Sequence, residues 1–93
     1  MRNLDSVVFI ENLPKLDLHG LDKDSAALAI KDYINDKIAE KKDVFKIIHG
    51  NGQGILRKVT SEVLSKHKSV LEFKAFYYNT GCTLVKIKIW QIF

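Results

Sequence analysis

The chain has one cysteine and one proline among its 93 residues. The scarcity of cysteine excludes one class of protein. Because Cys82 is the only cysteine, no disulfide can form within the chain, and a domain stapled by disulfides is excluded. No run reaches the roughly 18 apolar residues of a membrane-spanning helix, and the N-terminus lacks the apolar core of a signal peptide. We therefore expect a cytoplasmic protein with no membrane partner.

Length and charge narrow the class further. A chain of this size forms one small domain with a single modest core, and its 46% hydrophobic and 28% charged residues are ordinary for a globular domain. The net charge of +4 favours an acidic partner, with nucleic acid first among candidates. Lysines that only keep a small domain soluble explain the same charge equally well.

Hydrophobic periodicity predicts the order strand, helix, strand, helix, strand, strand. A helical crossover makes the first two strands parallel. The result is an α/β fold, more narrowly an α+β two-layer sandwich, in which a four-stranded mixed sheet carries two helices on one face and leaves the other face partly open and basic. The expected strands are 15–19, 43–49, 70–75 and 83–93, the expected helices are 23–41 and one that begins after Gly54, and Asn79-Thr80-Gly81 is the expected final turn.

Residues 1–14 are predicted to be an N-terminal extension, in which 7–10 would form an extra edge strand, and residues 15–93 to be the domain. Alternation in the third strand turns Leu71, Phe73 and Ala75 inward. The predicted core consists of Leu16, Leu18, Ile30, Ile34, Ile47, Val59, Val63, Phe73, Val85, Ile87 and Ile89.

Glycine is also scarce, and four of the five glycines lie in two similar motifs. The first is Leu16-Asp17-Leu18-His19-Gly20, and the second is His49-Gly50-Asn51-Gly52-Gln53-Gly54. Each is typical of a strand that ends in a His-Gly turn before a helix. In parallel strand–helix units, ligands gather where strands end and helices begin. The two motifs therefore predict a polar site at one edge of the sheet.

The residue types of this site indicate its chemistry. Histidine titrates near neutral pH and serves as a general acid or base, so the predicted catalytic residues are Asp17, His19 and His49. A lone histidine at the end of an element is more often a surface residue, and this interpretation is kept for His67, which suits the negative end of a helix. Two histidines and an aspartate could hold a divalent metal ion, but no spacing in the chain requires a metal.

The loop before the second helix is well made for phosphate, because free amides and the positive end of the helix dipole meet there. Glycines at this spacing also serve tight turns. A purely structural role therefore explains the loop, taken alone, about as well as phosphate binding does. The predicted phosphate-binding residues are Gly50, Asn51, Gly52, Gly54, Arg57 and Lys58.

Together the two motifs resemble the small MutS-related (Smr) domain family, which carries Leu-Asp-x-His after its first strand and His-Gly-x-Gly-x-Gly before its second helix. The similarity extends through Ile55-Leu56-Arg57 and runs from Leu16 to Ile89. It departs at Asn51, where many members have a basic residue, and at 79–83, where a glycine-rich segment is reduced. His19 is retained where some members carry arginine.

The resemblance implies a fold similar to the C-terminal domain of a bacterial translation initiation factor, nucleic-acid binding and, in many members, cleavage of DNA or RNA. The domain occurs alone or at the C-terminus of MutS-like ATPases, whose ATP-binding parts this chain does not contain, so no ATP site is expected.

We therefore expect an endonuclease in which His19 is the general acid or base at the scissile phosphate. Asp17 would orient it, activate water or hold a metal, His49 would be its partner or a phosphate donor, and Arg57 would stabilise developing charge. One alternative is a non-catalytic nucleic-acid-binding module that targets a larger recombination- or ribosome-associated protein. Another is a protein-interaction domain anchored by exposed Phe76, Tyr77, Tyr78 or Trp90. The sequence leaves open the choice of DNA or RNA and the oligomeric state.

Overall fold

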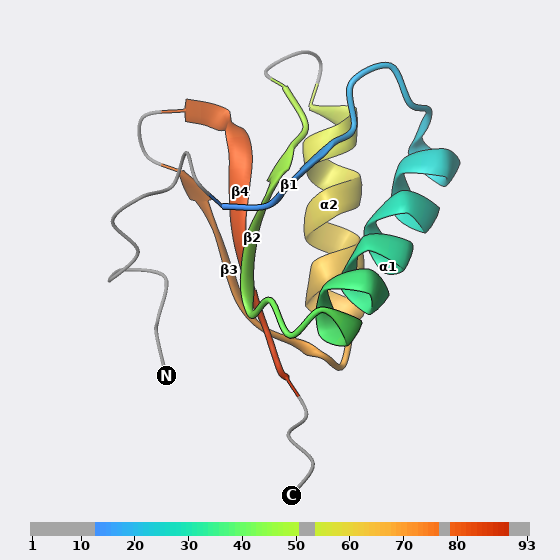
Figure 1. Ribbon diagram of the computed structural model, residues 1–93. Helices are drawn as coiled ribbons and strands as arrows, with labels where there is room; N and C mark the ends of the chain where they lie inside the picture. Colours follow the sequence, from blue (N-terminus) through green and yellow to red (C-terminus); the bar gives the residue numbers. More distant parts are fainter. Residues whose placement is uncertain (1–12, 51–53, 77–78, 90–93) are drawn as a thin grey trace, which may run out of the picture.

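The computed structural model describes residues 13–50, 54–76 and 79–89, and it contains two helices and one sheet. In chain order the elements are β1 (Lys15–Asp17), α1 (Lys23–Ala39), β2 (Val44–Ile48), α2 (Ile55–Lys66), β3 (Val70–Phe76) and β4 (Asn79–Ile87). The strand order in the sheet is β1-β2-β4-β3. β1 pairs parallel with β2, and the other two pairs are antiparallel. Both helices lie side by side on one face of the sheet (Figure 1), which confirms the predicted two-layer α+β fold.

The main core lies between the sheet and the helices. Every residue predicted for the core is either buried in it or packed against it. Phe45 of β2, which the prediction omitted, is fully buried, and its ring meets that of Tyr33 edge-on at a centroid distance of 5.1 Å. The predicted extra strand at 7–10 lies outside the described residues. Neither described helix is long and apolar enough to cross a membrane.

The two ends of α1 follow local rules. Asp22 is the N-cap, and its carboxylate accepts a hydrogen bond from the Ser25 N–H at 2.7 Å. At the other end the backbone N–H groups of Lys41 and Lys42 donate to carbonyls of the last turn. Lys41 adopts the left-handed conformation, with φ 58°, that usually takes glycine. The helix therefore ends two residues before the predicted boundary.

The predicted final turn was wrong, because Asn79-Thr80-Gly81 is the beginning of β4. The connection between β3 and β4 falls at 77–78, outside the described residues. The Gly81 carbonyl accepts hydrogen bonds from the N–H groups of His49 and Gly50 at 2.8 and 3.0 Å. These bonds extend the pairing of β2 with β4 and hold Gly81 in the sheet. The predicted end of the strand was also wrong, because β4 ends at Ile87.

A bulge in β3 changes which residues face inward. The register shifts between Val70 and Glu72, so that Leu71 is the extra residue on β3. Leu71 is consequently 48% exposed, whereas Phe73 packs against the core as predicted. A second irregularity follows Ala75, which is exposed on this edge strand. The inward position predicted for Leu71 was therefore wrong, whereas Ala75 shares the helix-facing side with its partner Thr83, as predicted, but is exposed there.

The sheet face away from the helices is also closed at its centre. Val44, Cys82 and Leu84 alternate with helix-facing residues, yet each is at most 3% exposed, and Lys86 is 7% exposed. Leu84 lies between Lys46 and Lys74, its partners on the flanking strands. Their half-buried aliphatic stems are placed to cover it. The prediction of a partly open face is therefore wrong at its centre, whereas the predicted basic side chains are present there in Lys46, Lys74 and Lys86.

The burial of Leu84 gives a test of this second apolar layer. Leu84→Ala is expected to lower the free energy of unfolding by about 2–4 kcal/mol, because it leaves a cavity in a closed environment. Leu28→Ala on α1 is the matched control, since Leu28 is 60% exposed. It is expected to change stability by less than about 0.5 kcal/mol. Urea denaturation measures both, and equal small effects would show that this face does not stabilise the fold.

Candidate functional site

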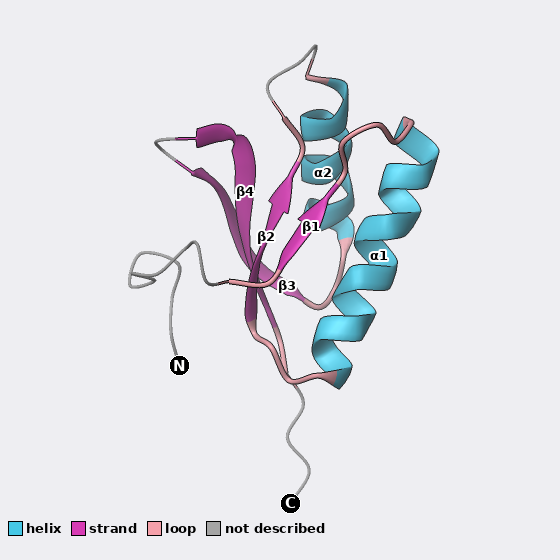
Figure 2. Ribbon diagram, turned by 45° about the horizontal axis from the view of Figure 1, so that its top comes forward, coloured by secondary structure: helices cyan, strands magenta, loops and turns pink. Residues whose placement is uncertain are grey.

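The two His-Gly motifs leave the sheet at the same end. In the parallel register Leu16 pairs with Ile47 and Asp17 with Ile48. The Leu18 N–H then donates to the Ile48 carbonyl at 2.8 Å. Figure 2 shows β1 and β2 side by side, each leading toward the N-terminal end of a helix. The two motifs therefore meet at one edge of the sheet, as predicted.

The turn between β1 and α1 presents His19 to solvent. Leu18 is fully buried, and its carbonyl accepts a hydrogen bond from the Leu21 N–H at 3.0 Å. Gly20 has φ 83°, a conformation that strains other residues at this point of a tight turn. The Asp17 carboxylate accepts the backbone N–H of His19 at 2.9 Å. Asp17 therefore holds the turn through the backbone, while the His19 side chain is exposed.

His49 has the opposite environment, because it is only 5% exposed. Its Nε2 lies 2.8 Å from Thr83 Oγ1, and its Nδ1 lies 3.1 Å from the Gly50 carbonyl oxygen. Since a carbonyl can only accept, we assign the proton to Nδ1, and Nε2 accepts from the Thr83 hydroxyl. Burial lowers the pKa of His49, and the charge of Arg57 acts in the same direction, while the bond to Gly50 opposes them. The ring is therefore neutral at pH 7.

Thr83 and Gly81 are site residues that the sequence interpretation missed. Both hold the second motif, Thr83 through the ring of His49 and Gly81 through two backbone bonds. A signal for Thr83 was available, because it alternates with the inward-facing Val85 and Ile87. A hydroxyl on an inward face requires a hydrogen-bond partner. Its position near the motif depends on the pairing of β2 with β4.

The start of α2 is open to an anion. Its N-cap is Gly54, with φ 84°, which has no side chain to cap the helix. The first hydrogen bond of the helix runs from the Lys58 N–H to the Gly54 carbonyl. The N–H groups of residues 55–57 come before this bond and therefore have no acceptor within the helix. The first turn of α2 contains no acidic residue. By contrast, the start of α1 already carries the Asp22 carboxylate.

The starts of both helices border one cleft of about 500 Å³. Of the residues predicted for the site, His49, Gly54 and Arg57 line it. His19 lies two residues before Leu21, which forms part of the wall. Asn51 and Gly52 lie outside the described residues. The full lining consists of Leu21, Asp22, Lys23, His49, Gly54, Ile55, Leu56 and Arg57.

The predicted catalytic residues do not converge on one point. The side chains of Asp17 and its register partner Ile48 lie on the sheet face away from the helices. His49 contacts Thr83, which lies on the helix face with Val85 and Ile87. Among the described residues no three His, Cys, Asp or Glu side chains form a group that could hold a metal ion.

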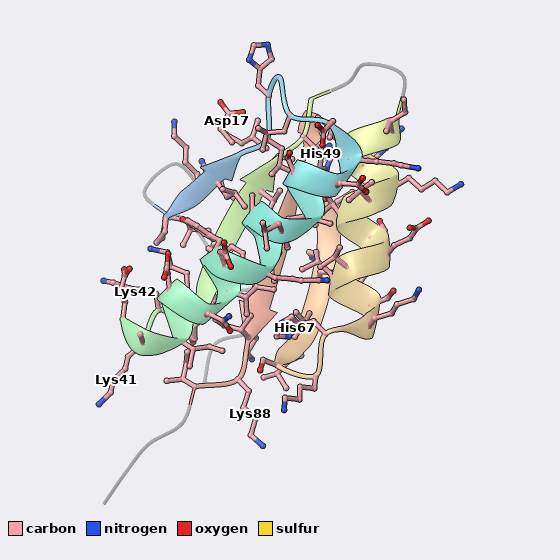
Figure 3. The ribbon with its side chains drawn as sticks, turned by 90° about the vertical axis from the view of Figure 1, so that its right-hand side faces the viewer. Asp17, Lys41, Lys42, His49, His67 and Lys88 are labelled. Atoms are coloured by element: carbon pink, nitrogen blue, oxygen red, sulfur yellow. The ribbon has the colours of Figure 1, made fainter. Side chains whose placement is uncertain are left out.

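Asp17 and His49 lie toward one end of the molecule in Figure 3. The opposite end carries three labelled lysines and a histidine: Lys41, Lys42, Lys88 and His67. His67 is the C-cap residue of α2, and its Nδ1 accepts the Ser69 N–H at 3.1 Å. Burial lowers the pKa of His67, and the charges of Lys31 and Lys68 lower it further. The structure thus places His67 at the C-terminal end of α2, as predicted, and its lowered pKa disfavours the charged form that the helix dipole would stabilise.

The buried neutral His49 predicts a pH dependence of stability. Its pKa in the folded protein is below the value of 6.5 expected in the unfolded chain. As pH falls below about 6.5, the unfolded chain therefore binds the proton first, and stability is lost. His49→Gln is expected to flatten the decline in unfolding free energy between about pH 7 and pH 5, measured by urea denaturation. Thr83→Ser, which keeps the imidazole and a hydroxyl, should decline as the parent does. An unchanged slope in His49→Gln would contradict this burial.

Known proteins are similar to this chain in sequence and in fold. The Smr domain family matches residues 16–88. Endonuclease MutS2 of Clostridium perfringens (strain SM101) is 32% identical over 76 residues, which cover 82% of this chain and 10% of that protein. Endonuclease MutS2 of Geobacillus sp. (strain WCH70) is 39% identical over 77 residues, which cover 80% of this chain and 10% of that protein. The chain thus spans about a tenth of the length of these relatives.

Solved structures are similar to this chain as well. The crystal structure of the Smr domain of Thermus thermophilus MutS2 has a TM-score of 0.79 and 26% identity, over 82% of this chain and 99% of that chain. YdaL, a stand-alone small MutS-related protein from Escherichia coli, has a TM-score of 0.75 and 18% identity, over 80% of this chain and 63% of that chain. The second similarity supports the fold alone. With a family match over residues 16–88 and the same fold in both structures, the chain belongs to the Smr domain family.

Proposed function

We propose that this domain is an endonuclease that cleaves a phosphodiester bond of DNA or RNA. The observation that carries the proposal is the cleft in which the open start of α2 and Arg57 face the turn that carries His19. The MutS2 relatives are named endonucleases, and the substrate of an endonuclease is a nucleic acid.

The phosphate contacts in this proposal come from α2. A phosphate at the start of a helix accepts hydrogen bonds from its first N–H groups and is favoured by its dipole. The exposed Arg57 adds a charged fork that matches phosphate oxygens. Lys58 is exposed on the same turn and adds positive charge. Gly50, Asn51, Gly52 and Gly54 complete the proposed phosphate loop.

Proton transfer is assigned to His19, because its side chain is exposed in the turn that leads to Leu21 of the cleft wall, while both ring nitrogens of His49 are hydrogen-bonded within the chain. Asp17 and His49 then act as positioning residues. Asp17 fixes the His19 turn, and His49 joins the end of β2 to β4. Arg57 would stabilise the extra negative charge of the phosphorane transition state. A need for a divalent metal ion is part of the test below.

A binding module without chemistry is the second candidate. Two of the three predicted catalytic residues, Asp17 and His49, make hydrogen bonds that hold backbone or neighbouring strands. In such a module the His19 turn and the start of α2 would contact phosphates and cleave nothing. Phosphate contacts supply affinity without chemistry, so binding alone does not distinguish the two candidates.

A reducing, cytoplasmic compartment also belongs to the proposal. Cys82 is a free cysteine and is 3% exposed. Burial raises the pKa of its thiol, which favours the less reactive protonated form. Cys82 is thus suited to packing in the sheet, and the proposed reaction assigns it no chemical step.

Cleavage assays with His19 variants test the chemistry. Labelled single- and double-stranded DNA and RNA are incubated with the protein, without ATP, in magnesium or in EDTA. His19→Ala is expected to reduce the cleavage rate by about 100- to 10,000-fold, the usual worth of a general acid or base, with binding largely kept. His67→Ala, at the far end of α2, is the matched control and should cut as the parent does. Cleavage by His19→Ala at the parent's rate would place the chemistry elsewhere and favour the binding module.

The salt dependence of binding tests the phosphate contacts. Arg57→Ala is expected to weaken binding to every nucleic acid and to lower the slope of log K against log salt by about one, because one phosphate contact is lost. Lys66→Ala, at the other end of α2, is the matched control and should keep the parent's slope. Fluorescence anisotropy between about 50 and 200 mM salt measures both. Binding that is indifferent to salt would contradict a phosphate site.

A further inference from the structure

The proposed phosphate site is bordered by two apolar side chains that face solvent. Leu21 is 38% exposed and Ile55 is 53% exposed, and both line the cleft. Leu21 comes from the connection between β1 and α1, and Ile55 is the first residue of α2. The phosphate contacts assigned above use N–H groups and a guanidinium, so they do not account for this apolar surface.

The volume of the cleft also exceeds what a phosphate needs. About 500 Å³ lies within the range of sites that take small organic ligands, which are mostly apolar with a few placed polar groups. The charged side chains that line the cleft come from the starts of both helices. Asp22 and Lys23 come from the start of α1, where the Asp22 carboxylate already caps the helix, and Arg57 comes from the first turn of α2, which has no acidic residue. A ligand with one anionic end and one flat apolar body would therefore place its anion toward α2.

We infer that this cleft takes the base of an unpaired nucleotide, held between Leu21 and Ile55, while the adjoining phosphate contacts the start of α2. This inference rests on the proposed function and specifies its substrate class as single-stranded or locally unpaired nucleic acid. Every base has two apolar faces, and these can pack against side chains whichever base it is. A base within a duplex is stacked on its neighbours and enters a pocket only when it is extruded.

Binding to three oligonucleotides of one length tests the inference. The probes are a fluorescein-labelled single strand, its blunt duplex, and the same strand with abasic sites in place of its central nucleotides. The parent is expected to prefer the single strand to the duplex and to the abasic strand. The double variant Leu21→Ala, Ile55→Ala is expected to lose about tenfold in affinity for the single strand, because the base no longer buries two aliphatic side chains. Its affinity for the duplex and the abasic strand should remain near that of the parent.

The chain supplies a matched control in the double variant Leu28→Ala, Leu71→Ala. These leucines are 60% and 48% exposed and do not line the cleft, so the control removes a similar amount of exposed apolar surface. It should bind all three probes as the parent does. Thermal denaturation of both double variants verifies that each is folded.

Two results would overturn the inference and leave the proposed function standing. One is a Leu21, Ile55 double variant that binds the single strand as tightly as the parent while Arg57→Ala weakens binding. The other is an equal loss of affinity for the intact and abasic strands. A parent protein that binds none of the three probes would overturn the proposed function, and the inference with it.

Discussion

The site depends on the parallel pairing of β1 with β2. The pairing is short, with three register pairs and the added hydrogen bond from the Leu18 N–H to the Ile48 carbonyl. It nevertheless makes both strands run in the same direction. A parallel pair joined by a helix must leave the sheet at the same edge. Both His-Gly turns and the N-terminal ends of both helices therefore meet there. Leu18, which is fully buried, anchors this edge to the core.

Two motifs that look alike in sequence have different physical roles. In the first, the carboxylate of Asp17 holds the backbone and leaves the His19 side chain exposed. In the second, His49 is buried between Thr83 and the Gly50 carbonyl. One histidine thus faces solvent, and the other stabilises the loop next to the cleft. The helices differ in the same way, since α1 carries its own capping carboxylate and α2 begins at a glycine.

Features governed by neighbours in the sequence could be predicted. The order of elements and the core residues follow from periodicity, and the meeting of the two motifs follows from the rule that a helical crossover joins parallel strands. Features set by distant segments could not. The strand character of 79–81 depends on bonds to the end of β2, and the exposure of Leu71 depends on a bulge. The burial of Leu84 depends on Lys46 and Lys74, its partners on the two flanking strands. The Thr83 partner of His49 is 34 residues away. The domain boundary after residue 14 stays a prediction.

The central claim is that nucleic acid binds where the start of α2 meets the His19 turn, and mapping of backbone amides by NMR tests it most directly. A short single-stranded oligonucleotide is titrated into ¹⁵N-labelled protein, and the chemical-shift change of each amide is recorded. The account predicts the largest changes at residues 19–22 and 54–57. Changes centred instead on Lys41, Lys42 and His67, at the opposite end of the molecule (Figure 3), would contradict it.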